Sequence, residues 1–307
     1  MERIGIIGSG RAGTALGAAL AAAGYPVVGV TARSQASRER AARLLPGIPI
    51  LSPAGLAGAA DVLVVAVPDD AIGAVAAELP TTPDQYVVHL SGAHGLAVLG
   101  RTAAVPVALH PPMTFTGTAV DVERIAEVTF TATAPAGARS LVERLVKDLG
   151  AGLQWVPDEQ RALYHAGVAH GANHLVTLLV QAFDVLRAAG IADPAVTLRP
   201  ILVATLDNTL RSGHDALTGP IARGDVDTVR AHLEALGEVG GRTMATYVEL
   251  ARATVEMAGA DGRLDRPAAE RLQAVLAAGA VRGQEAVRGQ DAVRGQAVSD
   301  RTGEAPR

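Results

Sequence analysis

The sequence predicts an α/β domain with a doubly wound parallel sheet, followed by an all-α domain. In the first half of the chain, short apolar runs alternate with Ala-rich stretches of helical character, which is the order that parallel strands joined by crossover helices require. The runs are apolar throughout, as expected of strands that are covered on both faces. This pattern stops at Pro157. We therefore expect an α/β domain at residues 1–157, a helical domain at 158–279 and a tail at 280–307.

The strands of the first domain are predicted from a series of apolar runs. In chain order they are RIGIIG, YPVVGVTA, residues 47–51, DVLVVAVP, YVVHLSG, VPVALH, EVTFTAT and GLQWVP. The third of these runs is the weakest. A helix is expected between the first two runs, from Arg11 to the stop signal at Gly24.

Helix start and stop signals divide the second domain. Asp158 is expected to cap a long helix that ends before Gly190. Asp193-Pro194 begins the next helix, because proline is tolerated in the first turn, and Pro200 is expected to kink or restart it. Further helices are expected at residues 225–238, 243–258 and 267–278.

The tail repeats a hexad. AVRGQE, AVRGQD and AVRGQ follow one another from Ala280 to Gln296. Three hexads are too few for a stacked solenoid, and they offer few apolar side chains to bury. We expect a disordered extension over residues 280–307.

Composition excludes several classes of protein. The net charge is −4 and the pI about 6.1, so we expect binding neither to nucleic acid nor to a membrane. The chain has no Cys, which excludes disulfides and suits a reducing cytoplasm. We find no signal peptide and no run of ~18 apolar residues.

The helices of the second domain carry broader apolar faces than one small bundle needs, and we expect a homodimer through that domain.

A glycine-rich motif lies where such a fold would bind a nucleotide. It reads G-x-G-x-x-G, follows the first predicted strand and opens the first predicted helix, which is the context that a Rossmann dinucleotide-binding loop requires. The three glycines allow a tight turn, the approach of a pyrophosphate and close packing of helix on strand. The alternative is a turn that binds nothing. The predicted cofactor contacts are Gly8, Ser9, Gly10, Arg11, Ala12 and Gly13.

The segment VVGVTARSQASR, residues 27–38, decides which nucleotide is expected. A free ribose 2′-hydroxyl requires a carboxylate near the end of the second strand, but residues 3–38 contain no Asp or Glu. Thr31, Arg33 and Ser34 place hydroxyl donors and a cation there instead, which suits a 2′-phosphate. We predict NADP(H) rather than NAD(H), with Arg33 as the main phosphate partner. The alternative is that Arg33 is only a solvated surface charge.

The carboxyl ends of the later strands carry polar side chains. In an open parallel sheet, ligands bind outside these ends. The runs end in Val67-Pro68-Asp69, in His89-Leu90-Ser91-Gly92 and in His110-Pro111-Pro112-Met113-Thr114-Phe115.

Several of these motifs resemble a known superfamily. AVPDDAI, LSGAHG and LHPPMTF are similar to motifs of the pyrroline-5-carboxylate reductase and β-hydroxyacid dehydrogenase superfamily. YHAGVAHGANHL and LTGPIARGD resemble one branch of it, Rossmann-like NADP(H) oxidoreductases with a C-terminal helical domain of unknown function. The resemblance covers residues 1 to about 279. Some members of this branch are linked to ketopantoate reduction.

The resemblance implies a substrate cleft between the two domains and a role for several residues. The cofactor's nicotinamide ribose would lie beside Val67, Pro68 and Asp69. Its reactive side would be lined by Ser91, Gly92 and His110, with His165, Asn173 and Thr218 coming from the helical domain. We take His165, Asn173, Ser91 and Thr218 as the candidate catalytic residues.

One position departs from the hydroxyacid dehydrogenase pattern. In that branch, a Lys on the long helix polarises the carbonyl, four residues before an Asn. Here Ala169 stands four residues before Asn173, and the nearest titratable side chain is His170. Simple 3-hydroxyacid dehydrogenase activity is therefore not expected.

The histidines of the long helix allow more than one interpretation. His170 and His174 have the spacing of half a metal site, but residues 166–183 contain no carboxylate, so we expect no metal. His165 is interpreted as a proton donor to the reduced group, with a purely structural histidine as the alternative. His110 is interpreted as a structural cap.

Asn173 and Thr218 are the remaining candidates. An amide in an apolar stretch of helix is costly unless it is bonded, so Asn173 is expected to bind a substrate oxygen or the carboxamide. A bond to a neighbouring helix is the alternative. The turn at Thr218 either presents its hydroxyl to a substrate carboxylate or is a plain connector.

These observations predict an NADPH-dependent reductase. The expected substrate is a small carboxylate-bearing 2-oxo acid, with 2-dehydropantoate as first candidate, or a cyclic imine. The alternative is an NADP(H)-binding sensor or interaction protein without turnover.

Overall fold

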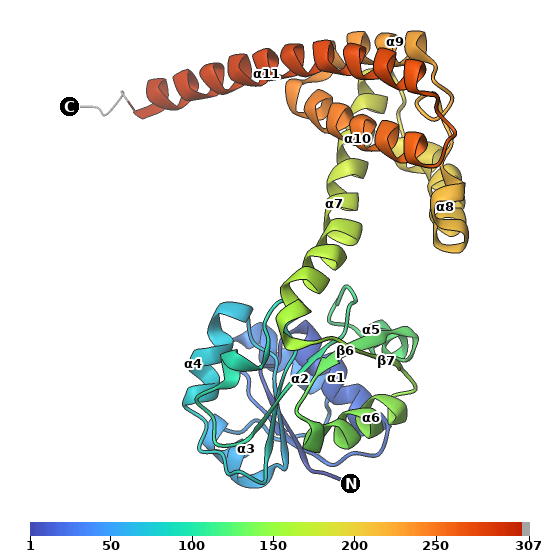
Figure 1. The fold of residues 1–307 in the computed structure, drawn as a ribbon. Coiled ribbons are helices and arrows are strands. Elements are labelled where there is room, and N and C mark those ends of the chain that lie inside the picture. Colours follow the sequence, from blue (N-terminus) through green and yellow to red (C-terminus); the bar gives the residue numbers. More distant parts are fainter. Residues whose placement is uncertain (303–307) are drawn as a thin grey trace, which may run out of the picture. The chain divides into compact units, whose positions relative to one another are not determined.

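The computed structural model describes residues 1–302, with side chains described as far as Gln284. The chain divides into two compact units, Met1–Asn173 and His174–Arg307 (Figure 1). The division falls inside helix α7 (Arg161–Ala188), later than the boundary expected at Pro157. The first turn of α7 belongs with the sheet, because Arg161 bonds to a strand-end loop.

A seven-stranded sheet forms the centre of the first unit. Its strands are β1 (Ile4–Ile7), β2 (Val27–Val30), β3 (Val62–Val65), β4 (Tyr86–His89), β5 (Val105–His110), β6 (Thr129–Thr133) and β7 (Gly152–Trp155). Their order is β2-β1-β3-β4-β5-β6-β7. The first five strands in this order are parallel, and Ile7, Val65, His89 and Ala108 lie in one row of the register. The loops that follow these strands therefore meet at one edge of the sheet.

Two strand predictions need correction. Strand β6 is antiparallel to β5, and β7 is parallel to β6, so the last two strands run against the other five. The connection from β5 to β6 contains helix α5 (Ala119–Arg124). Residues 47–51 form no strand; they contribute the isolated bridge between Val30 and Ile50. Pro49 lacks the N–H that a longer ladder would need.

Helices cover both faces of the sheet. In the first unit they are α1 (Arg11–Ala22), α2 (Gln35–Leu44), α3 (Pro53–Ala59), α4 (Ile72–Ala77), α5 and α6 (Arg139–Asp148), with short 3₁₀ segments at Asp69–Ala71, Leu96–Leu99, Ile125–Glu127, Ala136–Ala138 and Asp158–Gln160. Side chains from α1 and α6 share one buried cluster with Ile6 of β1, and those from α3 and α4 share the other with Ile7. The apolar strands predicted a sheet buried on both faces, and this prediction is confirmed.

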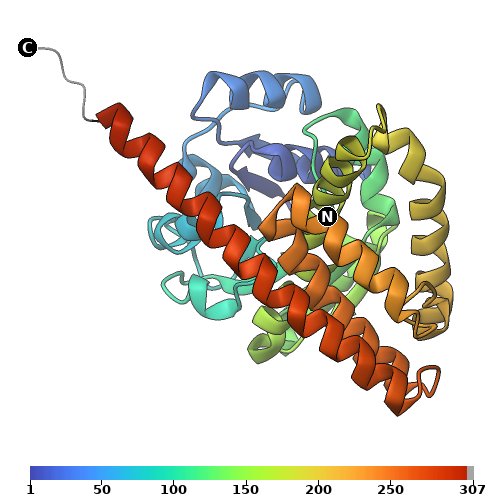
Figure 2. The same ribbon diagram turned by 90° about the horizontal axis from the view of Figure 1, so that it is seen from above.

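The second unit is helical. It holds the rest of α7, then α8 (Pro194–Ser212), a 3₁₀ segment (Gly213–Ala216), α9 (Val226–Val239), α10 (Gly241–Ala260) and α11 (Arg266–Thr302). Asp193 and Asp225 cap α8 and α9, and Pro200 lies inside α8 without ending it. The core comes mainly from α9, α10 and α11, of which α10 and α11 lie side by side (Figures 1 and 2).

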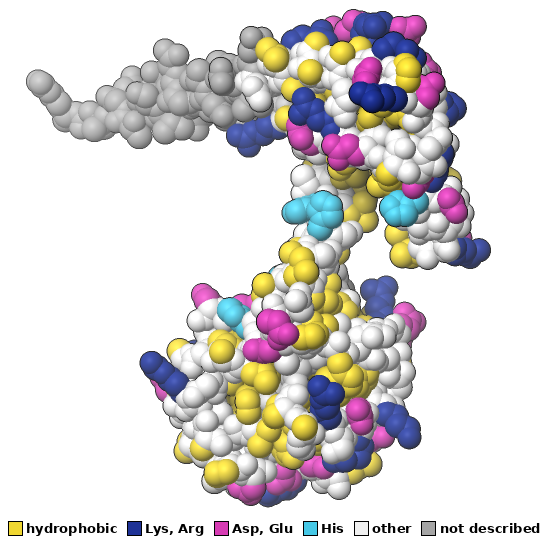
Figure 3. All heavy atoms as spheres, viewed as in Figure 1, with side chains coloured by type: hydrophobic (Ala, Val, Ile, Leu, Met, Phe, Trp, Pro, Cys, Tyr) yellow, Lys and Arg dark blue, Asp and Glu magenta, His cyan; other side chains and the backbone are white. Residues whose placement is uncertain are grey.

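Helix α8 contributes little to this core. Of its 19 residues, only Pro194 is buried. Large hydrophobic side chains are exposed along it, namely Val196, Ile201, Val203, Leu206 and Leu210. In Figure 3, hydrophobic side chains are visible on the surface of α8 and of α7. An apolar helix face in water indicates a missing partner surface.

The tail differs from its prediction. Helix α11 continues as far as Thr302, through most of the stretch that we expected to be disordered. The hexads consist mainly of good helix formers, and their first turn packs on the bundle: Gly283 is buried against Met244 of α10. Residues 303–307 of the predicted tail lie outside the described residues.

Candidate functional site

The three glycines of the G-x-G-x-x-G loop differ in what a Cβ would meet at each position. Gly8 adopts a φ of +108°, and a Cβ there would lie 2.4 Å from the carbonyl oxygen of Ala66. A Cβ on Gly13 would lie 2.1 Å from the carbonyl oxygen of Gly8. A Cβ on Gly10 would meet only the Ala66 oxygen, at an ordinary 3.8 Å. Nothing in the described protein needs a glycine at Gly10, which is the position that a pyrophosphate would approach.

The N-terminus of α1 fits a phosphate group. Gly10 is its N-cap residue, no side chain caps the helix, and its first turn has no acid. Its first backbone N–H groups and the positive end of its dipole are therefore available to an anion. Arg11 is exposed beside them and Ala12 is half-buried. Ser9 is buried and points inward, where its N–H and its hydroxyl both donate to the carbonyl of Thr31.

The polar side chains at the end of β2 are of two kinds: hydroxyls that make structural hydrogen bonds, and a guanidinium that makes none with another described residue. Thr31 accepts a hydrogen bond from the N–H of Gly8 at 2.8 Å, and Ser34 caps α2 by accepting from the N–H of Ser37. Both hydroxyls therefore have structural roles. Arg33 is exposed and makes no hydrogen bond or ion pair with another described residue. Arg40, which the sequence analysis missed, donates to the carbonyl of Ser9 at 2.8 Å.

The loops after β3 and β4 are joined by a serine and an aspartate. The Ser91 hydroxyl donates to Asp69 at 2.6 Å and accepts from the N–H groups of Ala93 and His94. Ser91 is buried, whereas Asp69, Pro68 and the loop around Val67 are half-buried or exposed. The Ser91 hydroxyl thus orders the loop at the edge where the candidate cofactor contacts gather.

Arg161, at the start of α7, is fully buried beneath this loop. Its guanidinium donates to the carbonyl of Ser91 at 2.6 Å and to the hydroxyl of Thr133 at 3.2 Å. Its Nε has no partner, and no described carboxylate forms an ion pair with it. Burial lowers the pKa of Arg161, while Tyr164 and Asp158 oppose this effect. Burying a cation without a carboxylate partner costs free energy, so such a residue usually has a role that offsets this cost.

His110 and His165 both lie against Gly92. A Cβ on Gly92 would lie 2.6 Å from Cδ2 of His165 and 3.1 Å from Nε2 of His110. The two imidazole rings meet edge to face, with centroids 6.2 Å apart. The Nδ1 atom of His110 is 2.8 Å from the hydroxyl of Tyr164. The end of β5, the loop after β4 and the start of α7 therefore bring together Gly92, two imidazoles and a phenol.

Both histidines at the strand ends are kept neutral. Burial, followed by the charge of Arg161, lowers the pKa of His89 to about 4. The same two causes, together with His165, lower the pKa of His110 to about 4, against the opposing charge of Asp69. His89 accepts from the N–H of Ser91 at Nδ1, so its Nε2 proton points to the carbonyl of Gly95. His89 is thus structural, whereas the Nε2 atom of His110 faces Gly92.

Two predicted catalytic residues are not brought to this cluster within the first unit. Asn173 is exposed on α7, eight residues beyond His165, which places it ~12 Å further along the helix axis and ~80° around it. Thr218 belongs to the second unit, where it is exposed in the turn after α8.

Asp158 also differs from its prediction. Instead of capping the long helix, its carboxylate accepts from the N–H of Leu96 at 2.7 Å, which anchors the loop after β4. A 3₁₀ turn separates Asp158 from the start of α7. Sequence reasoning also missed Arg161 and Tyr164; the only signal for them was their place just before His165.

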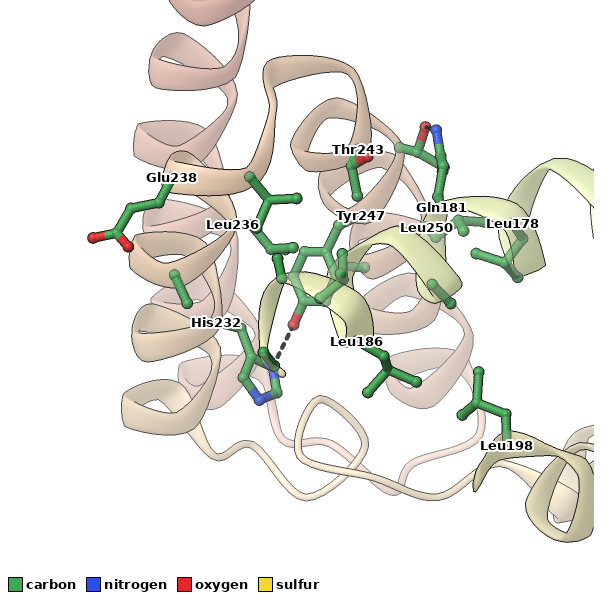
Figure 4. Close-up of a pocket in the computed structure, with 18 of the residues that line it drawn as sticks. Leu178, Gln181, Leu186, Leu198, His232, Leu236, Glu238, Thr243, Tyr247 and Leu250 are labelled. Carbon is green, nitrogen blue, oxygen red and sulfur yellow. Dashed lines mark hydrogen bonds between the residues drawn. The ribbon is translucent and has the colours of Figure 1, made fainter. Parts of the chain in front are cut away.

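The second unit contains a cavity of its own. It has a volume of about 860 Å³ and is lined by α7, α9, α10 and Leu198 of α8, with mostly apolar side chains (Figure 4). The hydroxyl of Tyr247 is bonded to Nδ1 of His232 at 2.9 Å, and Gln181 donates to Thr246. Among the described residues that line the cavity, only His232, Glu238 and Tyr247 are ionisable. The cavity therefore suits an apolar occupant.

Among the described residues, no group of three or more His, Asp or Glu side chains is placed to hold a metal ion. None of the described helices is long and apolar enough to cross a membrane.

A glycine loop on an uncapped helix, at the carboxyl edge of a mostly parallel sheet, defines a Rossmann-type dinucleotide-binding fold. Two family models agree with this assignment. The Rossmann-like domain model matches residues 2–111, and the model described as Domain of unknown function (DUF2520) matches residues 128–254. The chain thus combines a Rossmann-like domain with this C-terminal domain, as the resemblance of its motifs suggested. No curated protein matches it in sequence.

Solved structures share the fold over most of the chain. A protein of Thermotoga maritima is 21% identical, with a TM-score of 0.66, and the match covers 84% of this chain and 99% of that one. A Bacteroides fragilis protein assigned as an NADP oxidoreductase is 19% identical, with a TM-score of 0.66 and coverages of 84% and 97%. Plasmodium falciparum pyrroline carboxylate reductase, solved with NADP bound, is 14% identical, with a TM-score of 0.55 and coverages of 89% and 98%. The predicted fold class is confirmed.

Proposed function

We propose that this protein is an NADPH-dependent reductase. The observation that carries the proposal is Gly10, a glycine that the described protein does not need, at an uncapped helix N-terminus on the carboxyl edge of the sheet. A bound nicotinamide dinucleotide supplies hydride for the reduction of a carbonyl or imine. The Bacteroides and Plasmodium proteins of the same fold, described as an NADP oxidoreductase and as a pyrroline carboxylate reductase, favour this class of reaction.

The cofactor proposal is NADP(H) rather than NAD(H). It rests on the absence of acids around the end of β2 and on Arg33, whose guanidinium is exposed and unpaired among the described residues. A 2′-phosphate attracts such a cation, whereas the carboxylate that would hold a free 2′-hydroxyl is missing. Ser34 presents the N-terminus of α2 beside it.

The proposed substrate is a small carboxylate-bearing 2-oxo acid, with 2-dehydropantoate first, or a cyclic imine. The choice rests on the resemblance of the motifs to the branch linked to ketopantoate reduction. Ser91 orders the loop that faces the reaction, and His165 is placed beside Gly92, where an imidazole suits proton transfer. Asn173 and Thr218 are proposed to bind the substrate's oxygens.

Consumption of NADPH at 340 nm tests the proposal. The panel comprises 2-dehydropantoate, other branched 2-oxo acids and pyrroline carboxylates, with NADPH affinity measured in the same buffer. We expect turnover with at least one member of the panel. Tight binding of NADPH without any turnover would instead favour a sensor or interaction protein that keeps the nucleotide site but performs no reduction.

The proposed partner is a second copy of the chain. The second unit carries both an apolar cavity of about 860 Å³ and the apolar helix α8, of which only Pro194 is buried. Two complementary apolar surfaces on one unit can cover each other across a twofold axis. The cytoplasm is the proposed compartment, since the chain has no Cys.

A further inference from the structure

His110 makes a hydrogen bond with a neighbouring side chain, in contrast to His165. The hydroxyl of Tyr164 lies 2.8 Å from Nδ1 of His110, and the two rings meet edge to face with centroids 5.7 Å apart. His165 makes no hydrogen bond with another described residue; its only ring contact is with His110. An imidazole that is bonded on one nitrogen has its tautomer fixed by that bond.

The direction of the bond to Tyr164 decides which nitrogen of His110 carries the proton. When the phenol donates to Nδ1, which is the direction that a relay requires, the neutral ring carries its own proton on Nε2. The Nε2 and Cε1 atoms of His110 lie close against Gly92, each 3.1 Å from where a Cβ on this residue would be. The absent side chain thus lets the ring approach the loop after β4.

The charges around His110 favour the neutral ring. Arg161 and His165 on α7 are the cationic or titratable neighbours, Tyr164 is its bonded partner, and Asp69 after β3 is the carboxylate that acts on it. Burial and Arg161 outweigh Asp69, so the pKa of His110 falls to about 4. At neutral pH the ring therefore keeps a single proton.

We propose that His110 and Tyr164 form the proton relay of the reduction. This inference rests on the proposed reductase function. The reduced nicotinamide supplies a hydride to the carbon of the C=O or C=N bond, and Nε2 of His110 gives its proton to the heteroatom. Nδ1 takes the proton of the Tyr164 hydroxyl at the same time, so that the ring stays neutral. Tyr164 is half-buried and regains its proton from water.

The relay gives the unpaired Arg161 a role. The proton transfer leaves a transient phenolate on Tyr164, and Arg161 interacts electrostatically with Tyr164. A preformed buried cation stabilises such a charge without reorganisation. Arg161 is thus a positioning residue: it also holds the loop after β4 through the carbonyl of Ser91.

The first test is spectroscopic and needs no substrate. Long-range ¹H–¹⁵N spectra of the histidines in the full chain should show His110 as the neutral Nε2–H tautomer from pH 7 to 5. Tyr164→Phe should shift the Nδ1 resonance of His110, because the hydrogen bond is lost. A ring that is protonated on Nδ1 at pH 7, or that titrates near 6.5, would overturn the relay even if the protein proves to be a reductase.

The second test uses turnover. We expect Tyr164→Phe to lower kcat by roughly 10- to 100-fold with little change in KM, and His110→Asn to lower it more than His165→Asn does. Tyr86→Phe, on a half-buried phenol at the start of β4 that makes no hydrogen bond with another described residue, is the matched control. An unchanged kcat in Tyr164→Phe would overturn the relay but not the reductase, whereas a wild-type protein without turnover on any substrate would count against the reductase.

Discussion

Gly10 is the residue that most clearly distinguishes a nucleotide-binding loop from a glycine-rich turn that binds nothing. Gly8 and Gly13 are required by the protein itself, since a Cβ at either would lie within 2.4 Å of a backbone oxygen. Gly10 has no such neighbour, and its φ of −68° is available to any residue. The motif predicts different roles for the three glycines, and the distances in the structure agree with that division.

This difference predicts opposite phenotypes for two alanine variants. Gly10→Ala should fold with a free energy of unfolding within about 1 kcal/mol of the wild type, yet lose NADPH affinity at least about tenfold. Gly13→Ala should lose more than about 2 kcal/mol of stability, because its Cβ would lie 2.1 Å from the Gly8 oxygen. Urea unfolding and NADPH titration check the pair. Full NADPH affinity in a folded Gly10→Ala protein would contradict the assignment of the loop.

Residue-level prediction worked where the chemistry is local. The glycine motif and the caps Asp193 and Asp225 depend on neighbours within a few positions. Tyr164 and His110 are 54 residues apart, and Arg161 reaches Ser91 over 70, so no spacing rule could find them. His110 was interpreted as a structural cap for this reason.

At the scale of elements, apolar runs and Gly or Pro punctuation located the described strands and most helices. They did not determine strand direction, since nothing in the residues of β6 marks it as antiparallel to β5. Repeats with the composition of a linker were expected to be disordered, but the same Ala, Arg and Gln residues favour the helix α11 that continues through them.

The exposed apolar face of helix α8 is predicted to form the dimer contact. Ile201→Asp and Leu206→Asp should turn a dimer into a monomer at micromolar concentration, because each places a charge on an exposed apolar face. Asn208→Asp adds the same charge at an exposed polar position of the helix and serves as the control. Sedimentation velocity checks the result. A wild-type protein that is monomeric at the same concentration would contradict a dimer through this helix.

At the scale of the whole molecule, one chain combines a nucleotide-binding sheet with a helical unit that has its own core and cavity. Helix α7 belongs to both units, and its first turn supplies Arg161, Tyr164 and His165 to the edge of the sheet. The proposed proton relay therefore lies in the first unit, and the second unit is proposed to bind substrate and a second copy of the chain.

The most direct test of the central claim, that the edge of the sheet binds NADPH, is equilibrium titration of the full chain with NADPH and with NADH. We predict a clear preference for NADPH, and a loss of roughly 10- to 100-fold in NADPH affinity in Arg33→Ala, with NADH affinity nearly unchanged, because only the 2′-phosphate meets this cation. Arg101→Ala, at another exposed arginine of the first unit, should change neither affinity. Equal affinity for the two cofactors, or the same preference for NADPH in Arg33→Ala as in the wild type, would contradict the claim.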